Sequence, residues 1–172
     1  PTLMYIGCCD SRVEPGPLVG AGPGDVFVVR TVANIVPPPE SPLASVVGSA
    51  LEFGIDGLKI PHLAVCGHTD CGGIQAIEAG SEPTESHPHL RDWLGLAGEL
   101  NDQTASENES PEERHIRLVE ANVRLQRDRL LQYSVVARAL EERRLKVHGW
   151  YFDLRDQKMH WYDTKTDAFQ SE

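Results

Sequence analysis

Three short apolar runs, each bounded by turn-forming residues, constrain the fold of this chain more than any other feature of its sequence. Residues 3–7, 25–32 and 63–66 are rich in aliphatic and β-branched side chains, and glycines at or near each run mark the turns. Runs of this length with such flanks are typical of buried β-strands. Because a helical pattern lies between the second and third runs, we expect a mainly parallel sheet with helical crossovers.

The helical pattern covers residues 41–53, where apolar side chains recur at i, i+3, i+4, i+7 and i+8. Ser41 fits the N-cap and Pro42 the first helical position. Ser110 and Glu113 form a capping-box sequence that predicts the start of a long amphipathic helix. The other helices are predicted to start after Gly72-Gly73 and run through Ile77, and to cover residues 90–100, 110–131 and 135–143.

The last part of the chain changes to an alternating pattern. Residues 145–154 and 159–163 alternate well enough to form a strand pair, with a turn between them. Such a pair adds an antiparallel edge to a parallel sheet. We therefore predict an α/β fold with a mainly parallel central sheet, an added antiparallel strand and flanking helices.

Composition limits the partners of this fold. The chain has 172 residues, which is the size of one ordinary domain. Its 16 Lys and Arg residues against 26 Asp and Glu residues leave a net charge of −10, which argues against a basic face for nucleic acid or anionic lipid. No apolar run approaches the ~20 residues that a membrane-spanning helix needs. We expect neither nucleic acid nor membrane as a partner.

The four cysteines are few for a disulfide framework, and their placement favours metal or thiolate chemistry in a reducing compartment. Cys8 directly follows the first predicted strand, and His68 and Cys71 follow the third. The carboxyl ends of parallel strands gather functional groups at one edge of a sheet. Two thiolates and one imidazole suit Zn²⁺, and three protein ligands leave a fourth position open, as in catalytic zinc sites.

Two other interpretations of these residues stay open. Cys8, His68 and Cys71 could be a buried cysteine pair with an incidental histidine. A structural zinc site could instead be completed by Cys9 or Cys66. We expect these two cysteines to be packing residues, because adjacent cysteines rarely point at one ion and strand alternation turns Cys66 away.

Asp10 and Arg12 follow Cys8 at steps of two within one tight turn. A carboxylate paired with a guanidinium has a lowered pKa and stays ionised. Beside a metal, Asp10 could accept a hydrogen bond from a solvent molecule and orient it. It could also move in and occupy the fourth position itself, or the pair could only stabilise the turn.

These motifs resemble successive blocks of the β-class carbonic anhydrases over nearly the whole chain. The blocks are GCCDSRV, GDVFVVRTVAN, VCGHTDCGG, EANV and HGWYFD. The resemblance implies a zinc lyase (carbonate dehydratase) that hydrates carbon dioxide reversibly to bicarbonate and a proton. It implies one Zn²⁺ per subunit held by Cys8, His68 and Cys71, with Asp10 and Arg12 as the catalytic pair.

The same resemblance implies a substrate site and an assembly. Phe27 and Val32 match apolar positions that line the carbon dioxide pocket, and Phe53 matches an aromatic residue contributed across a dimer interface. Gly72 would offer its backbone N–H to a substrate oxygen at a helix N-terminus. We expect a homodimer or dimer of dimers, in the cytoplasm or in an organelle stroma or matrix.

The chain also differs from the usual pattern of this family at its N-terminal end. Members of the family usually have one or two N-terminal helices before the first strand, so we expect residues 1–172 to be a single zinc-dependent catalytic domain without this N-terminal helical arm. Two other functions remain in view: a carbon disulfide or carbonyl sulfide hydrolase on the same fold, and a non-catalytic zinc or redox module.

Overall fold

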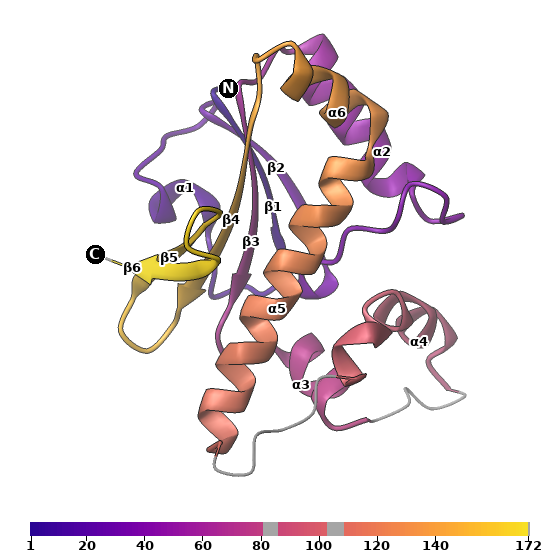
Figure 1. Ribbon diagram of the computed structural model, residues 1–172, viewed down its shortest axis with the longest axis vertical. Coiled ribbons are helices and arrows are strands. Elements are labelled where there is room, and N and C mark those ends of the chain that lie inside the picture. Colours follow the sequence, from indigo (N-terminus) through magenta and orange to yellow (C-terminus); the bar gives the residue numbers. More distant parts are fainter. Residues whose placement is uncertain (81–85, 103–108, 172) are drawn as a thin grey trace.

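The computed structural model describes residues 1–80, 86–102 and 109–171, which build one six-stranded sheet with helices around it (Figure 1). The strand order is β2-β1-β3-β4-β5-β6. Pairing is parallel from β2 through β4 and antiparallel from β4 through β6. The strands are β1 Leu3–Cys8, β2 Val26–Thr31, β3 His62–His68, β4 Lys146–Asp153, β5 Lys158–Asp163 and β6 Ala168–Ser171. The predicted α/β fold is confirmed, and β6 is an antiparallel strand that the sequence pattern did not predict.

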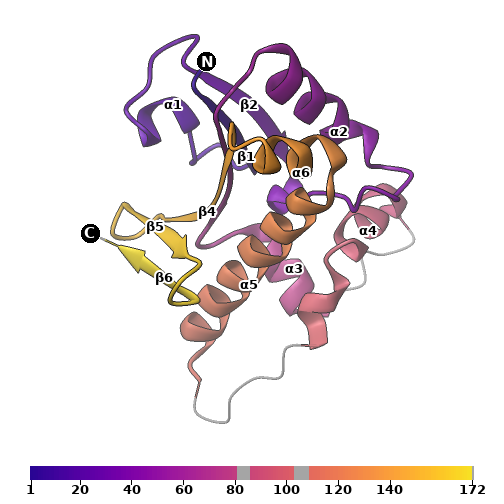
Figure 2. The ribbon, with the colours of Figure 1, turned by 45° about the horizontal axis from the view of Figure 1, so that its top comes forward.

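The helices pack around this sheet, and the long helix α5 crosses one face of it, over β3 and β4 (Figure 1). Helices α2 and α6 lie side by side beyond one end of α5 (Figures 1 and 2). The helices are α1 Pro15–Leu18, α2 Ser45–Leu51, α3 Gly72–Glu78, α4 Pro88–Gly95, α5 Pro111–Gln132 and α6 Ser134–Glu141. Shorter helical turns are η1 Val32–Asn34, η2 Glu52–Gly57 and η3 Gly98–Asp102.

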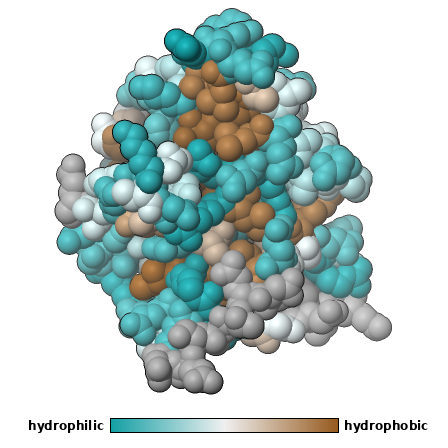
Figure 3. All heavy atoms as spheres, in the orientation of Figure 1, coloured by the Kyte–Doolittle hydropathy of each residue, from teal (hydrophilic) through white to brown (hydrophobic). Residues whose placement is uncertain are grey.

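The central strands are continuous apolar runs in the sequence because their side chains are buried. Met4 and Ile6 of β1, and Leu63 and Val65 of β3, are completely buried. Helix α5 approaches this sheet closely because a glycine lies where the helix passes. A Cβ atom on Gly67 would lie only 2.9 Å from a methyl group of α5. Outside the core, polar side chains surround separate apolar patches (Figure 3). No helix in the described ranges has the length and apolar character needed to cross a membrane.

The start of α5 confirms the capping box. Ser110 Oγ accepts a hydrogen bond from the Glu113 backbone N–H at 3.2 Å, and the Glu113 carboxylate accepts one from the Ser110 N–H at 2.9 Å. Two backbone donors that the helix cannot satisfy are therefore bonded.

Two predicted helices differ from the structure. Helix α2 begins at Ser45, so the N-cap assignment of Ser41 is wrong: its hydroxyl accepts a bond from the Leu43 N–H inside a separate turn. At its other end α2 continues into the π-helical turn η2, which ends at Gly57. The predicted helix at 90–100 is α4 followed by η3; α4 ends at Gly95 and η3 begins at Gly98. Glycine weakens a helix because it loses more backbone freedom on folding than other residues.

Candidate active site

The carboxyl ends of β1 and β3 bring three predicted ligands together. Cys8 is the last residue of β1, His68 is the last residue of β3, and Cys71 directly precedes α3. The Cys8 and Cys71 sulfur atoms lie 4.0 Å apart, and a ligand atom of each of the three residues lies within 4.8 Å of the others. All three side chains are buried. The structure thus confirms that these residues form one group able to bind a metal.

The donor atoms of this group fit zinc. His68 Nδ1 lies 2.8 Å from the Thr69 carbonyl oxygen, to which it donates its proton. The other ring nitrogen, Nε2, is buried and has no hydrogen-bond partner among the described residues, so its lone pair is free for a metal. This is the arrangement of metal-binding histidines, in which the second ring nitrogen is fixed by a backbone carbonyl. Two sulfurs and an imidazole nitrogen are donors that Zn²⁺ prefers.

The other two cysteines do not belong to this group among the described residues. Cys66 is buried, and its thiol donates to the Gly67 carbonyl at 3.4 Å, in line with its expected packing role. Cys9 is exposed, so the expectation that it packs in the core is wrong. A zinc site completed by either residue is not supported.

The two ligand thiols influence each other strongly. The hydrogen bond between the sulfurs lowers the pKa of Cys8, because the thiolate form of Cys8 is the acceptor. The same hydrogen bond, together with burial, raises the pKa of Cys71. Cys8 therefore loses its proton readily, whereas Cys71 beside it keeps its proton. A divalent cation would remove that limit, because metal ions deprotonate coordinating thiols.

Asp10 and Arg12 form a two-pronged ion pair beside the group. Arg12 Nε lies 2.9 Å from Asp10 Oδ1, and Arg12 Nη2 lies 2.7 Å from Asp10 Oδ2. The Arg12 hydrogen bond is the main reason that the pKa of Asp10 is held well below its usual range. Asp10 Oδ2 also lies 3.8 Å from His68 Nε2. An ionised carboxylate thus stands at the edge of the candidate metal site.

Arg30 is a residue of this site whose contacts the sequence did not reveal. Its Nη1 donates to the carbonyl oxygens of Cys8 at 3.3 Å and Asp10 at 3.2 Å, and its Nη2 bonds the Glu14 carboxylate at 3.0 Å. The guanidinium therefore fixes the turn between the first ligand and the carboxylate. The sequence feature that could have indicated this role is the position of Arg30, a charged residue directly after four apolar residues of a predicted buried strand.

The residues expected to line the substrate pocket lie on three neighbouring elements. The rings of Phe27 in β2 and Phe53 in η2 are 6.0 Å apart between centroids. Val32 begins η1 directly after Thr31, which pairs with Cys8 across the sheet. Gly72 is the first residue of α3, and a helix does not satisfy the N–H groups of its first turn. Phe53 is 58% exposed and Val32 39% exposed.

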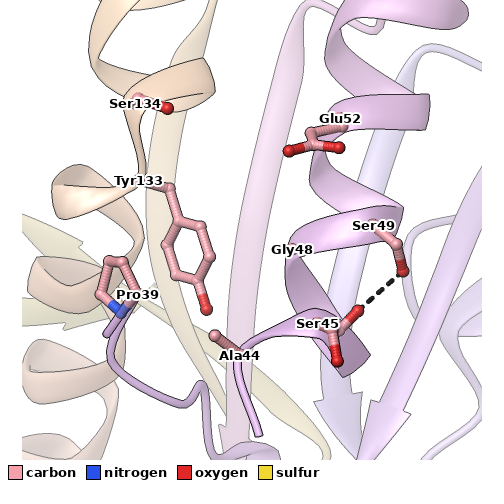
Figure 4. Close-up of a pocket in the computed structure, with 8 residues that line it drawn as sticks. All are labelled: Pro39, Ala44, Ser45, Gly48, Ser49, Glu52, Tyr133 and Ser134. Atoms are coloured by element: carbon pink, nitrogen blue, oxygen red, sulfur yellow. Dashed lines mark hydrogen bonds between the residues drawn. The ribbon is translucent and has the colours of Figure 1, made fainter. Parts of the chain in front are cut away.

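A separate cavity of about 360 Å³ lies between α2 and the junction of α5 and α6 (Figure 4). In Figure 4 the Tyr133 ring and the Glu52 carboxylate lie on opposite sides of it, and Ser49 Oγ donates to the Ser45 carbonyl at 2.8 Å. None of the predicted site residues lines this cavity.

Comparisons with known proteins agree with one another. The family model described as Carbonic anhydrase matches residues 3–159. A carbonic anhydrase of Emericella nidulans is 37% identical over 157 residues, which cover 91% of this chain and 67% of that protein. The solved structure of the β-carbonic anhydrase CcaA superposes with a TM-score of 0.92 at 27% identity, covering all of this chain and 84% of the other.

A third comparison concerns assembly. One of two β-carbonic anhydrases of the ascomycete Sordaria macrospora, described as tetrameric, matches with a TM-score of 0.79 at 30% identity. The match covers 99% of this chain and 82% of that one.

Proposed function

Since this chain belongs to the carbonic anhydrase family, and within it to the β class, we propose that Cys8, His68 and Cys71 hold a zinc ion for its reaction. That reaction is the reversible hydration of carbon dioxide to bicarbonate and a proton. The observation that carries the zinc proposal is the buried Nε2 of His68, which lacks a hydrogen-bond partner and lies beside two sulfurs. The relatives are named carbonic anhydrases, so neither a sister hydrolase nor a non-catalytic zinc module is favoured.

Zinc, when bound, supplies the Lewis acidity that makes water a nucleophile near neutral pH. Asp10 accepts a hydrogen bond from the attacking water and so directs a lone pair at the carbon atom of the substrate. Arg12 keeps this carboxylate ionised and in place. The N–H of Gly72 donates to a substrate oxygen, where negative charge develops. Phe27, Val32 and Phe53 form the apolar wall against which carbon dioxide lies.

The contacts of Asp10 favour an open metal site over one capped by this carboxylate. Both of its oxygens bond to Arg12, and the Arg12 guanidinium is itself bonded to the Asp70 carbonyl at 3.0 Å. Moving Asp10 onto the metal would break two charge-assisted hydrogen bonds, which are stronger than neutral ones. A zinc-edge absorption spectrum measured across pH distinguishes an exchangeable oxygen from an Asp10 ligand.

Site-directed variants test these roles. We expect Cys71→Ala and His68→Ala to lose both zinc and turnover, because two ligands hold the ion poorly. Asp10→Asn should keep one zinc per chain and lose most turnover, because the amide is a weaker acceptor. Metal analysis and carbon dioxide hydration on the same preparations separate the two effects. Full turnover in metal-free His68→Ala would refute the zinc proposal, and full turnover in Asp10→Asn would remove Asp10 from the mechanism.

We further propose that a second copy of the chain pairs with the β2 edge, giving a homodimer or a dimer of dimers. Strand β2 ends the sheet, and an unpaired edge invites another strand. Val28 of this strand is 44% exposed, and Phe53, whose ring centroid lies 6.0 Å from that of Phe27 in β2, is 58% exposed. The tetrameric Sordaria macrospora protein supports an assembly of this kind.

Residues 1–172 are in this proposal one catalytic domain. Its four cysteines are free thiols, which supports a reducing compartment such as the cytoplasm or an organelle stroma or matrix.

A further inference from the structure

Helix α5 buries four polar side chains, and three of them, beyond His115, lie in its second half. Asn122, Gln126 and Arg129 follow one another at i, i+4 and i+7, so they lie along one side of the helix. Their exposed fractions are 1%, 0% and 6%. Buried polar groups destabilise a fold unless they are hydrogen-bonded, so their partners are informative. We call these three residues the α5 ladder.

The α5 ladder binds the backbone of one short segment, residues 33–36. Asn122 Nδ2 donates to the Ala33 carbonyl at 3.0 Å, and Gln126 Oε1 accepts from the Val36 N–H at 2.8 Å. Arg129 Nη1 donates to the Val36 carbonyl at 3.3 Å. The ladder is also bonded internally, since Gln126 Nε2 donates to Asn122 Oδ1 at 2.8 Å. Each end of the segment is therefore held by a buried side chain.

This segment has an uncommon backbone conformation. Ala33 has φ of 55° and Asn34 has φ of 47°, so two successive residues other than glycine are left-handed. Each such residue is strained and persists only where its surroundings impose it. Both residues are buried, and the ladder bonds to Ala33 and Val36 restrain them together with the bond from the Thr31 hydroxyl to the Ile35 carbonyl at 2.9 Å.

The position of the segment connects it with the active site. It directly follows Val32, and Trp93 Nε1 donates to the Val32 carbonyl at 3.0 Å. On its other side Ala33 lies against the start of α3, where a Cβ atom on Gly73 would be only 2.7 Å from the Ala33 Cβ. A shift of this turn would therefore move the proposed pocket wall and press on the helix that follows Cys71.

We infer that the α5 ladder consists of positioning residues for the hydration reaction, which hold the turn at residues 33–36 so that Val32 keeps its place in the carbon dioxide pocket. The inference rests on the proposed pocket, in which Val32 contacts substrate. The ladder itself has no hydrogen bond to the metal group or to Asp10 and Arg12 in the described part of the chain. It should consequently affect how substrate is held more than how it is converted.

Gln126→Met tests this, because it keeps the length of the side chain and removes its three hydrogen bonds, to Val36, Asn122 and Arg129. In the zinc-loaded enzyme we expect KM for carbon dioxide to rise about five- to tenfold, with kcat within about twofold and one zinc retained per chain. Amide hydrogen exchange, measured on peptides covering residues 32–37, should accelerate about tenfold or more while β3 stays protected. Gln126→Glu should raise KM less than Gln126→Met, because its carboxylate still accepts from the Val36 N–H and faces Arg129 but loses the bond donated to Asn122 Oδ1.

Leu130→Val is the matched control for a loss of stability, because Leu130 is completely buried in the same helix and apolar. It should lower the unfolding temperature and leave KM and exchange at residues 32–37 unchanged. If Gln126→Met does not fold, Arg129→Lys replaces it, because an ammonium group cannot hold both the Val36 and Leu96 carbonyls as Arg129 does. It should raise KM by a smaller factor.

Unchanged KM in the folded ladder variant, or an equal rise of KM in Leu130→Val, would overturn the inference. The variant Val32→Ala distinguishes an error in the inference about the α5 ladder from an error in the proposed carbon dioxide pocket. Wild-type KM in Val32→Ala would overturn the pocket and the inference together. A raised KM in Val32→Ala beside a normal KM in Gln126→Met would overturn the inference alone.

Discussion

At the scale of single residues, the Asp10 carboxylate shows how one partner controls the charge of a proposed catalytic group. Both of its oxygens bond to Arg12, and a third bond comes from the Arg12 backbone N–H at 2.9 Å. These bonds stabilise the ionised form, so the pKa of Asp10 is lowered in the folded chain. Asp10 is therefore an acceptor, and not a proton donor, throughout the neutral range.

This lowered pKa predicts how acid affects stability. The unfolded chain binds the Asp10 proton near the ordinary pKa of 3.8, and the folded chain binds it only at lower pH. The stabilisation is thus complete above pH about 4 and is lost as the pH falls through the folded pKa. We expect the metal-free wild type to unfold at higher denaturant concentration than metal-free Asp10→Asn at pH 7. The difference should shrink below pH about 4. Urea titrations between pH 7 and 2.5 measure it, and a difference that grows on acidification would contradict the prediction.

Much of the site at this scale was predictable from the sequence. Cys8 and His68 each end an apolar run, and the ends of parallel strands meet at one edge, so their convergence follows from the pattern. Arg30 was not predictable in the same way, because two of its partners are the carbonyl oxygens of Cys8 and Asp10, which any residue type offers, and no sequence pattern pairs it with Glu14. The roles of Phe27 and Gly72 came from resemblance and stay predictions.

At the scale of elements, the start of α3 depends on the absence of a side chain. Gly73 is the second residue of α3, and the Ala33 Cβ occupies the space where its side chain would be. Gly72, the preceding residue, has no atom within 4 Å of its Cβ position. Packing therefore requires a glycine at position 73 but not at position 72.

This contrast gives a prediction for two alanine variants. Gly73→Ala should destabilise the chain by about 1–3 kcal/mol, because the two Cβ atoms overlap and either η1 or α3 must shift. Gly72→Ala should change stability little, since alanine has the higher helix propensity and meets nothing. Thermal unfolding of both variants at equal zinc loading checks this. Equal losses of stability would mean that packing against Ala33 is not the reason.

The limits of sequence analysis at this scale lie at helix ends. The start of α5 was predicted because Ser110 and Glu113 form a motif whose hydrogen bonds are local. The predicted start of α2 was wrong because serine followed by proline is favoured at the start of a turn as well as at the start of a helix. The continuation of α2 into η2 and the strained turn of η1 depend on tertiary packing, which periodicity does not record.

At the scale of the whole molecule, the sheet has two different ends. The β6 end belongs to a short antiparallel hairpin with aromatic packing, where Tyr162 and Phe169 lie 5.4 Å apart between ring centroids. The β2 end is a parallel strand with Val28 44% exposed. The apolar character of this second edge favours it for association between copies.

A charge on this edge should therefore dissociate the assembly. We expect Val28→Lys to lower the mass found by sedimentation velocity, because burying an unpaired ammonium group at an interface is costly. Leu90→Lys is the control, since Leu90 is similarly exposed but belongs to α4. It should leave the mass unchanged. An unaltered mass in a folded Val28→Lys variant would exclude this edge as the interface.

The distance along the chain between the two candidate zinc ligands with sulfur has a consequence for folding. Cys8 and Cys71 are 63 positions apart, so an ion held by both closes a long loop, as a covalent cross-link would. Tying distant points together removes conformational freedom from the unfolded ensemble, and this effect increases with loop length. Metal loading and the joining of β1 to β3 are thus thermodynamically linked: a chelator that strips the ion removes a tether between two of the central strands.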